Sequence, residues 1–272
     1  MPHSQTAHSL SERGKSPNIR QLIYRFDLLR NLVWRDYSLR YKHSVLGLLW
    51  SLVLPLTQLL VLVFLFQAVV PLNIEAYPAF VFSAILPWGW FSNSLSSACN
   101  LFINNRDLIR HPNFAPASLT FINTLSNLIA FLVALPLLFI VLVAYGRPIT
   151  PALFLLPLLL LIQGILTAGL SLIIATCNAF YRDVQHIVVV ALTLLFYLTP
   201  VFYRPEAVAA QYQIVYQLNP IAVLIRSYRA LFFEGTAPSI AALLFTSLTS
   251  IAIFALGYSI YSRRQHEIID KI

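Results

Sequence analysis

The sequence contains very little charge. Only 10% of its 272 residues are Asp, Glu, Lys or Arg, whereas 58% are hydrophobic. Soluble domains carry about 25% charged residues, because water must hydrate their surface. A soluble fold is therefore excluded, and the mean hydropathy of +0.75 indicates a surface that faces lipid.

Cysteine is almost absent, and the first 18 residues contain no apolar run. Cys99 and Cys177 lie in separate apolar stretches, and neither has a Cys or His partner at the spacing of a metal site. We therefore interpret both as small packing residues and expect no disulfide framework. Residues 1–18 have no apolar core of the kind that a cleaved signal needs, and we predict that they form a disordered cytoplasmic tail.

Enzyme motifs are missing too. The sequence has no H-E-x-x-H, no G-x-S-x-G and no paired carboxylates within an apolar run. Gly14-Lys15-Ser16 resembles the end of a phosphate-binding P-loop, but Ser9 stands where that motif requires Gly. We expect no catalytic residue, no metal ligand and no cofactor in this chain. The apolar runs also lack the ionisable groups of ion-driven carriers, which favours an energy source on a separate ATPase.

Long uncharged runs locate the predicted membrane spans. A helix needs about 20 predominantly apolar residues to cross the hydrocarbon core of a bilayer. Six stretches meet this requirement, and the sequence predicts an all-α integral membrane protein with six transmembrane helices within residues 45–262. The predicted spans cover residues 45–70, 79–103, 115–145, 150–178, 187–203 and 239–261.

Two further segments are predicted to contact the membrane without crossing it. Within residues 19–44, apolar side chains recur every three or four residues opposite several arginines, which is typical of an amphipathic helix in the interface. Residues 205–234 contain the Asn219-Pro220 break, so we expect two short re-entrant helices in the outer leaflet. The alternative is that residues 207–225 form a seventh span, which would place the C-terminus outside.

The basic residues set the predicted orientation. With the N-terminus in the cytoplasm, 14 of the 18 Lys and Arg residues lie in inner segments. Arg147, Arg204, Arg226 and Arg229 alone lie on the outer side. This asymmetry follows the positive-inside rule and places both termini in the cytoplasm, with residues 263–272 as a cytoplasmic tail. The net charge of +8 is thus a topology signal, and we expect no nucleic-acid partner.

Four parts of the sequence resemble the membrane subunit of ABC-2 type exporters, in the branch that exports O-antigen, capsule or teichoic-acid polymers. RDYSLRYKHSVLGLLWSLVLPL (35–56) resembles the first helix and span of that family, and NNRDLIRHPNFAPASL (104–119) its loop between spans two and three. FYRDVQHIV (180–188) resembles its Arg-Asp loop between spans four and five. LFYLTPVFYRPE, LNPIAVLIRSYRALFFEG and YSRRQHEIIDKI resemble, in this order, the fifth span, the outer re-entrant helices and the tail of the family.

This resemblance implies a permease subunit that exports a lipid-linked polysaccharide across the bacterial inner membrane. It implies a homodimer of this chain with two copies of a separate ATPase, which would bind ATP and Mg. The alternatives are a permease for drugs or other lipids, and a membrane enzyme acting on lipid-linked sugars. The enzyme would need carboxylates or histidines clustered near the membrane surface, and the sequence offers no such cluster.

The resemblance also implies that two short inner loops transmit the movement of the ATPase to the membrane helices. The expected coupling residues on these loops are Arg106, Asp107, Arg110, Arg182 and Asp183. The alternative for Arg182 and Asp183 is a local ion pair at the helix ends, worth about 0–1 kcal/mol.

Aromatic side chains are the predicted lining of the polymer path. Sugars have flat CH faces that can lie against aromatic rings, although belt or packing roles are the alternative. The candidates are Trp88, Trp90, Phe91, Tyr197, Phe202, Tyr203, Tyr228 and Phe232. Polar residues of the second span, such as Ser92, Ser94, Ser96 and Ser97, are expected either to face the channel or to bind neighbouring helices.

Overall fold

The computed structural model describes residues 33, 50–70, 72–110 and 114–271. These residues form helices of the α, 3-10 and π types and no strands, which confirms the all-α class. The predicted tail over 1–18 lies outside the described residues. The predicted interface helix over 19–44 also lies outside them, apart from Val33.

Six helices correspond in position to the six predicted spans. Where the structure describes both ends of a predicted span, the helix ends lie within a few residues of them, except that the last helix extends further at its C-terminal end. The helices are α2 (Trp50–Val63), which continues as the π-helix η2 (Phe64–Val69), α3 (Tyr77–Ala98), α6 (Ser118–Ala144), α7 (Leu156–Phe180), which follows the 3-10 helix η3 (Pro151–Leu155), α8 (Val184–Leu198) and α11 (Ile240–Lys271).

Four of these helical segments are long and apolar enough to cross a membrane. They are Leu52–Val69, Ser118–Ala144, Pro151–Phe180 and Ile240–Ile269. The two that fall short do so for different reasons. Helix α8 has 15 residues, whereas the C-terminal half of α3 is rich in Ser and Asn.

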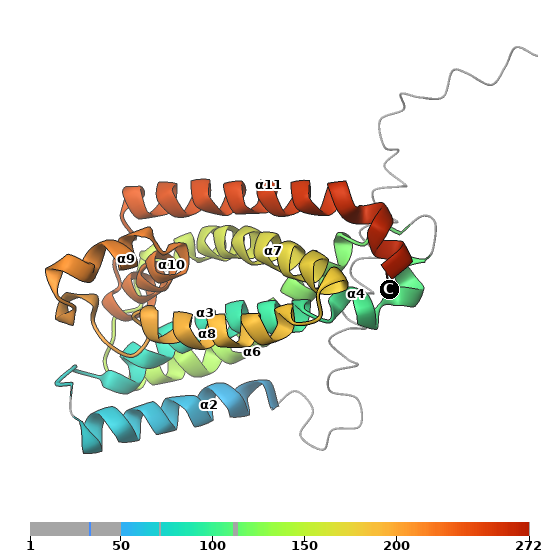
Figure 1. Ribbon diagram of the computed structural model, residues 1–272. Coiled ribbons are helices and arrows are strands. Elements are labelled where there is room, and N and C mark those ends of the chain that lie inside the picture. Colours follow the sequence, from blue (N-terminus) through green and yellow to red (C-terminus); the bar gives the residue numbers. More distant parts are fainter. Residues whose placement is uncertain (1–32, 34–49, 71, 111–113, 272) are drawn as a thin grey trace, which may run out of the picture.

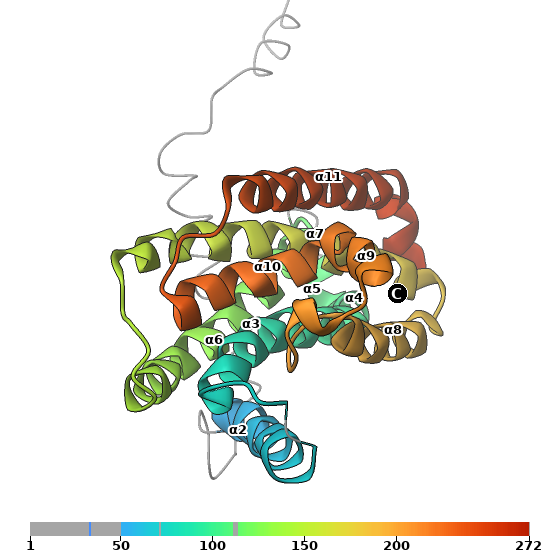
Figure 2. The same ribbon diagram turned by 90° about the vertical axis from the view of Figure 1, so that its left-hand side faces the viewer.

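Helix α3 tolerates these polar residues because protein surrounds it. It contacts α2, α6, α7 and α8, and 17 of its 22 residues are buried. Figure 2 shows α3 between α6 and α8. Neighbouring helices bind its polar groups: the Trp90 indole donates to the Thr124 carbonyl oxygen at 3.0 Å, and the Gln163 amide donates to the Pro87 carbonyl oxygen at 2.8 Å. These hydrogen bonds satisfy the buried polar groups, so the groups can lie in an apolar environment without destabilising the fold.

Helices α7 and α11 lie side by side at a glycine contact (Figure 1). A Cβ atom added to Gly257 would lie 2.5 Å from the Gly169 carbonyl oxygen. A Cβ atom added to Gly169 would lie 2.6 Å from the Phe254 Cα atom. Both obstacles are backbone atoms, so only glycine permits this approach, as is common where membrane helices pack closely.

The segment between α8 and α11 consists of short helices with a break where the sequence predicts one. The elements are η4 (Pro205–Ala207), η5 (Ala210–Tyr212), α9 (Gln213–Leu218), α10 (Pro220–Arg229) and the π-helix η6 (Ala230–Glu234). The Asn219 side-chain oxygen accepts hydrogen bonds from the backbone N–H groups of Ile221 and Ala222 at 3.2 and 3.4 Å, so it caps α10. The predicted break at Asn219-Pro220 is thereby confirmed.

The two ends of the molecule carry different elements (Figure 1). One end carries α9 and α10 and is called the α9 end. The other carries α4 (Leu101–Asn104), α5 (Arg106–Ile109) and the C-terminus, and is called the α4 end.

The segment expected as a cytoplasmic tail is helical, since residues 263–271 continue α11 without a break. The physical reason is packing, since Ile268 is fully buried in a small cluster with Phe102, Ile109 and Leu119 at the α4 end. Helical packing therefore extends beyond the apolar run that defined the span.

Candidate functional site

A groove of about 410 Å³ lies between α2, α3 and α8. Its α3 wall is formed by Trp88, Ser92 and Ser96, which recur every four residues and thus share one helix face. Gln58 faces them from α2. Helix α8 contributes Val189, Leu192, Thr193, Phe196 and Tyr197, again one face of a helix. The groove therefore combines aromatic rings with uncharged polar groups.

The serines of α3 divide between the groove and the helix packing. Ser92 and Ser96 line the groove. Ser97 donates to the Asn123 side-chain oxygen at 2.6 Å, and the Asn123 amide donates to the Ser94 carbonyl oxygen at 2.8 Å. The packing role expected from the sequence thus occurs on one face of α3, and the groove lies on another.

A continuous row of rings leads from the groove to the α9 end. We call it the aromatic ladder, and it consists of Trp88, Phe196, Phe202, Tyr203 and Tyr216. The ring centroids of successive members lie 5.6, 5.7, 4.9 and 6.2 Å apart. These spacings are those of packed aromatic pairs, so the ladder is an unbroken row of ring contacts.

Three segments hold the ladder in place. The Phe66 ring of η2 stacks on Phe202 with a centroid distance of 5.3 Å. The Tyr77 hydroxyl donates to the Phe202 carbonyl oxygen at 3.0 Å. The Tyr203 hydroxyl donates to the Tyr197 carbonyl oxygen at 2.9 Å and lies 2.9 Å from the Tyr216 hydroxyl. Tyr197 itself packs beside Phe196 and Phe202 and is 61% exposed.

Four of the eight predicted path residues come together here, namely Trp88, Tyr197, Phe202 and Tyr203, although Trp88 lines the groove with only 5% of its surface exposed. The other four are buried in the core of the chain, with exposed fractions of 3% for Trp90, 2% for Phe91, 0% for Tyr228 and 1% for Phe232. Their placement gives no support to a path role.

Packing explains three of these four buried rings, because Phe131 lies between Trp90 and Tyr228, and Tyr228 stacks on Phe232. Phe196 and Tyr216 were not among the predicted residues. Phe196 could have been predicted, because it is an aromatic residue next to Tyr197.

The predicted coupling residues all lie at the α4 end. Arg106, Asp107, Arg110, Arg182 and Asp183 are exposed. Among the described residues, ion pairs join Arg147 to Glu75 and Arg264 to Glu267, and none involves these five. The alternative of a local Arg182–Asp183 ion pair is therefore not supported.

Side-chain amides join the two inner loops. The Asn178 amide donates to the Cys99 carbonyl oxygen at 2.6 Å, and the Asn178 oxygen accepts from the Gln185 backbone N–H at 3.1 Å. The Asn100 amide completes the set by donating to the Gln185 side-chain oxygen at 3.4 Å. We call Asn100, Asn178 and Gln185 the amide clasp. It connects the end of α3 to α7 and to the start of α8.

Similar proteins are found by comparison of sequences. Residues 27–233 match the model of a family described as ABC-2 type transporter. An O-antigen export system permease protein RfbA of Myxococcus xanthus is 35% identical over 256 residues, which cover 93% of this chain and 98% of that protein. A protein of the same name from Klebsiella pneumoniae is 32% identical over 252 residues, covering 91% and 95%. The matched family range includes the groove, the ladder and both inner loops.

Proposed function

Because the chain belongs to the ABC-2 type transporter family, we propose that it is the membrane permease subunit of a polysaccharide exporter. The observation that carries the substrate class is the nearly end-to-end match to permeases named for O-antigen export. The polymer is carried on a lipid, and energy comes from a separate ABC ATPase, to which ATP and Mg are assigned. The chain is a multi-pass membrane protein and a transport subunit, not itself catalytic.

The groove between α2, α3 and α8 is the proposed polymer path, and it favours a homodimer. Gln58 and Thr193 are polar groups in a groove that opens beside the largely exposed apolar faces of α2 and α8. Polar groups facing lipid are costly. A second copy placed on the same face by a two-fold axis would cover both grooves at once and enclose a channel between the subunits.

Six spans remain our proposal for the topology, with both termini in the cytoplasm of a bacterial inner membrane. Helices α3 and α8 run between the same two ends as the four long apolar segments (Figure 1), and α3 is screened from lipid by its neighbours. At 1.5 Å per residue, α10 reaches only about 15 Å, which is too short to cross. A seventh span over 207–225 is therefore disfavoured, and the re-entrant position of 205–234 is retained.

Cysteine labelling tests this topology. In a chain with Cys99 and Cys177 replaced by Ala, single cysteines at Asn73 and Ala209 are expected to react with a membrane-impermeant maleimide in intact cells. A cysteine at Lys271 is expected to react only after the cells are opened. Labelling of position 271 from outside would show that the segment between α8 and α11 crosses the membrane.

The exposed charges of the two inner loops at the α4 end are the proposed contact with the ATPase. Arg182 and Asp183 lie in the turn between α7 and α8, and Arg106, Asp107 and Arg110 lie on or beside α5. The amide clasp holds the two loops together, so movement of either loop is passed to α3 and α8. Short loops with little slack suit this transmission.

Reconstitution with the partner ATPase tests both the function and the coupling. The purified permease alone is expected to hydrolyse no ATP, whereas the complex in vesicles hydrolyses ATP and moves lipid-linked polymer across the bilayer. A double variant, Arg182→Ala with Asp183→Ala, is expected to assemble normally, since exposed substitutions cost little stability, and to lose at least about 90% of export.

The matched control for the coupling is Arg263→Ala, which removes an exposed arginine of α11 at the same end. Export by this variant should stay at the wild-type rate. ATP hydrolysis by the isolated permease would refute the assignment of the ATPase to a partner. Normal export by the double variant would refute the coupling role of the α7–α8 turn.

A further inference from the structure

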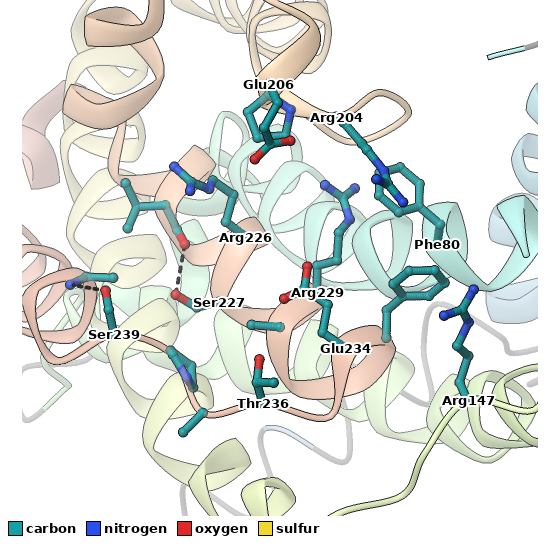
Figure 3. Close-up of a pocket in the computed structure, with 17 residues that line it drawn as sticks. Phe80, Arg147, Arg204, Glu206, Arg226, Ser227, Arg229, Glu234, Thr236 and Ser239 are labelled. Atoms are coloured by element: carbon teal, nitrogen blue, oxygen red, sulfur yellow. Dashed lines mark hydrogen bonds between the residues drawn. The ribbon is translucent and has the colours of Figure 1, made fainter. Parts of the chain in front are cut away.

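The four arginines that depart from the cytoplasmic charge bias converge on one cavity. Arg147 follows α6, Arg204 follows α8, and Arg226 and Arg229 belong to α10. All four line a cavity of about 630 Å³ at the α9 end, shown in Figure 3. Arginine on the outer side is disfavoured by the usual charge distribution of membrane proteins. Four arginines from three separate segments nevertheless cluster here, so their clustering needs a local structural reason.

Arg229 is held in the wall of the cavity with unused donors. Its side chain is 4% exposed, and its guanidinium carbon lies 3.7 Å from the centroid of the Phe80 ring. One terminal nitrogen donates to the Val201 carbonyl oxygen at 2.8 Å. The Nε and the other terminal nitrogen have no hydrogen-bond partner among the described residues. Buried donors of a charged group are costly when unpaired, so the site is built to donate to something else.

The carboxylates near the cavity do not neutralise it. Glu206 and Glu234 also line it, but within the described part of the chain neither forms an ion pair, and Arg147 pairs instead with Glu75 outside the cavity. Four cationic groups thus face two carboxylates. Burial lowers the pKa of the Arg229 guanidinium to about 9, an effect that the charges of Glu234 and Glu206 oppose. Arg229 therefore remains protonated at neutral pH, and the cavity keeps a net positive charge.

We propose that this cavity binds an anion of phosphate chemistry, a phosphate or a diphosphate group. The planar guanidinium fork matches the oxygens of phosphate. Arginines that approach from three segments suit an anion with acceptor oxygens on several sides, as phosphate has and a planar carboxylate lacks. The anion is either free or the headgroup of a lipid. The assignment rests on the arginines and the cavity and does not require the proposed transport activity.

Binding of inorganic pyrophosphate tests the site. The full-length chain in a neutral detergent is titrated with pyrophosphate by isothermal calorimetry at fixed ionic strength, and saturable binding is expected. The double variant Arg204→Gln with Arg226→Gln changes two exposed side chains of the cavity, and it is expected to bind at least about tenfold more weakly, because two charge-assisted hydrogen bonds are removed. Arg229→Gln should weaken binding as well, but it also removes a structural contact.

The control variant is Arg263→Gln, which makes the same change at the α4 end and should leave the affinity unaltered. The proposal is overturned if the wild-type chain shows no saturable binding. It is also overturned if Arg263→Gln weakens binding as much as the double variant, because the anion would then sense only the overall charge.

Nanodiscs distinguish the two sources of the phosphate group. In pure phosphatidylcholine, pyrophosphate should bind as it does in detergent. If the natural occupant is a lipid headgroup, discs with phosphatidylglycerol should suppress pyrophosphate binding by the wild-type chain. The residual binding of the double variant should then be the same with and without phosphatidylglycerol. If it is a free anion, the affinity should be equal in both kinds of disc. Either result supports the site, and binding that the double variant leaves unchanged in both discs would overturn it.

Discussion

Replacing Gly257 with alanine is expected to push α11 away from α7 and to lower the stability of the chain markedly. The new Cβ would lie 2.5 Å from the Gly169 carbonyl oxygen and 3.2 Å from Ile173. The carbonyl belongs to a helix backbone and cannot turn aside. Overpacking of this kind costs about 1–3 kcal/mol, which exceeds the gain of about 1 kcal/mol that alanine brings to a helix.

Gly89→Ala provides the matched control for this prediction. Gly89 also lies within a helix, but a Cβ atom added there would meet nothing within 4 Å. The melting temperature of the purified chain, followed by size-exclusion chromatography after heating, should fall for Gly257→Ala and hold or rise for Gly89→Ala. Equal melting temperatures for the two variants would show that the α7–α11 contact is looser than described.

Export is expected to fall about tenfold when two rings of the path are replaced with leucine at unchanged protein level. The change combines Tyr197→Leu and Phe202→Leu. Leucine keeps much of the apolar volume and removes the flat face, and each lost ring contact is worth about 0.5–1.5 kcal/mol. Tyr197 is 61% exposed, so the loss of its ring should affect the passing polymer more than the packing.

Tyr258→Leu with Phe139→Leu is the corresponding control. Tyr258 is an exposed ring on α11, and Phe139 is a partly buried ring that packs on Phe232. Neither lies in the groove or the ladder, so this pair should leave export unchanged. Alanine at Tyr197 and Phe202 provides a second comparison. If leucine preserves export while alanine lowers the protein level, the two rings serve packing alone and the aromatic path is wrong.

The long helices were predictable because lipid imposes one strong demand on the sequence. A charged side chain within a bilayer is costly, so uncharged runs delimit the helices. The Asn219-Pro220 break was equally accessible, because Pro220 suits the first turn of a helix. The packing of the last residues was not, because the burial of Ile268 depends on Phe102 and Ile109 from distant parts of the chain.

The aromatic residues that come together were mostly adjacent in the sequence. Phe202 and Tyr203 belong to the ladder, and Tyr197 packs beside Phe202. Trp90 and Tyr228 belong to the same residue types but pack in the core, since aromatic rings serve cores and paths alike. Hydrophobicity does not reveal which neighbour each face of a helix meets.

The amide clasp also determines how the groove can widen. Helix α3 ends and α8 begins beside this joint, since Asn178 binds both the Cys99 carbonyl oxygen and the Gln185 backbone. The Tyr77 hydroxyl makes a second joint at the opposite end, because it donates to the Phe202 carbonyl oxygen just beyond α8. Helices that are held at both ends cannot separate by tilting alone. A passenger wider than the groove would therefore need one of these two joints to break.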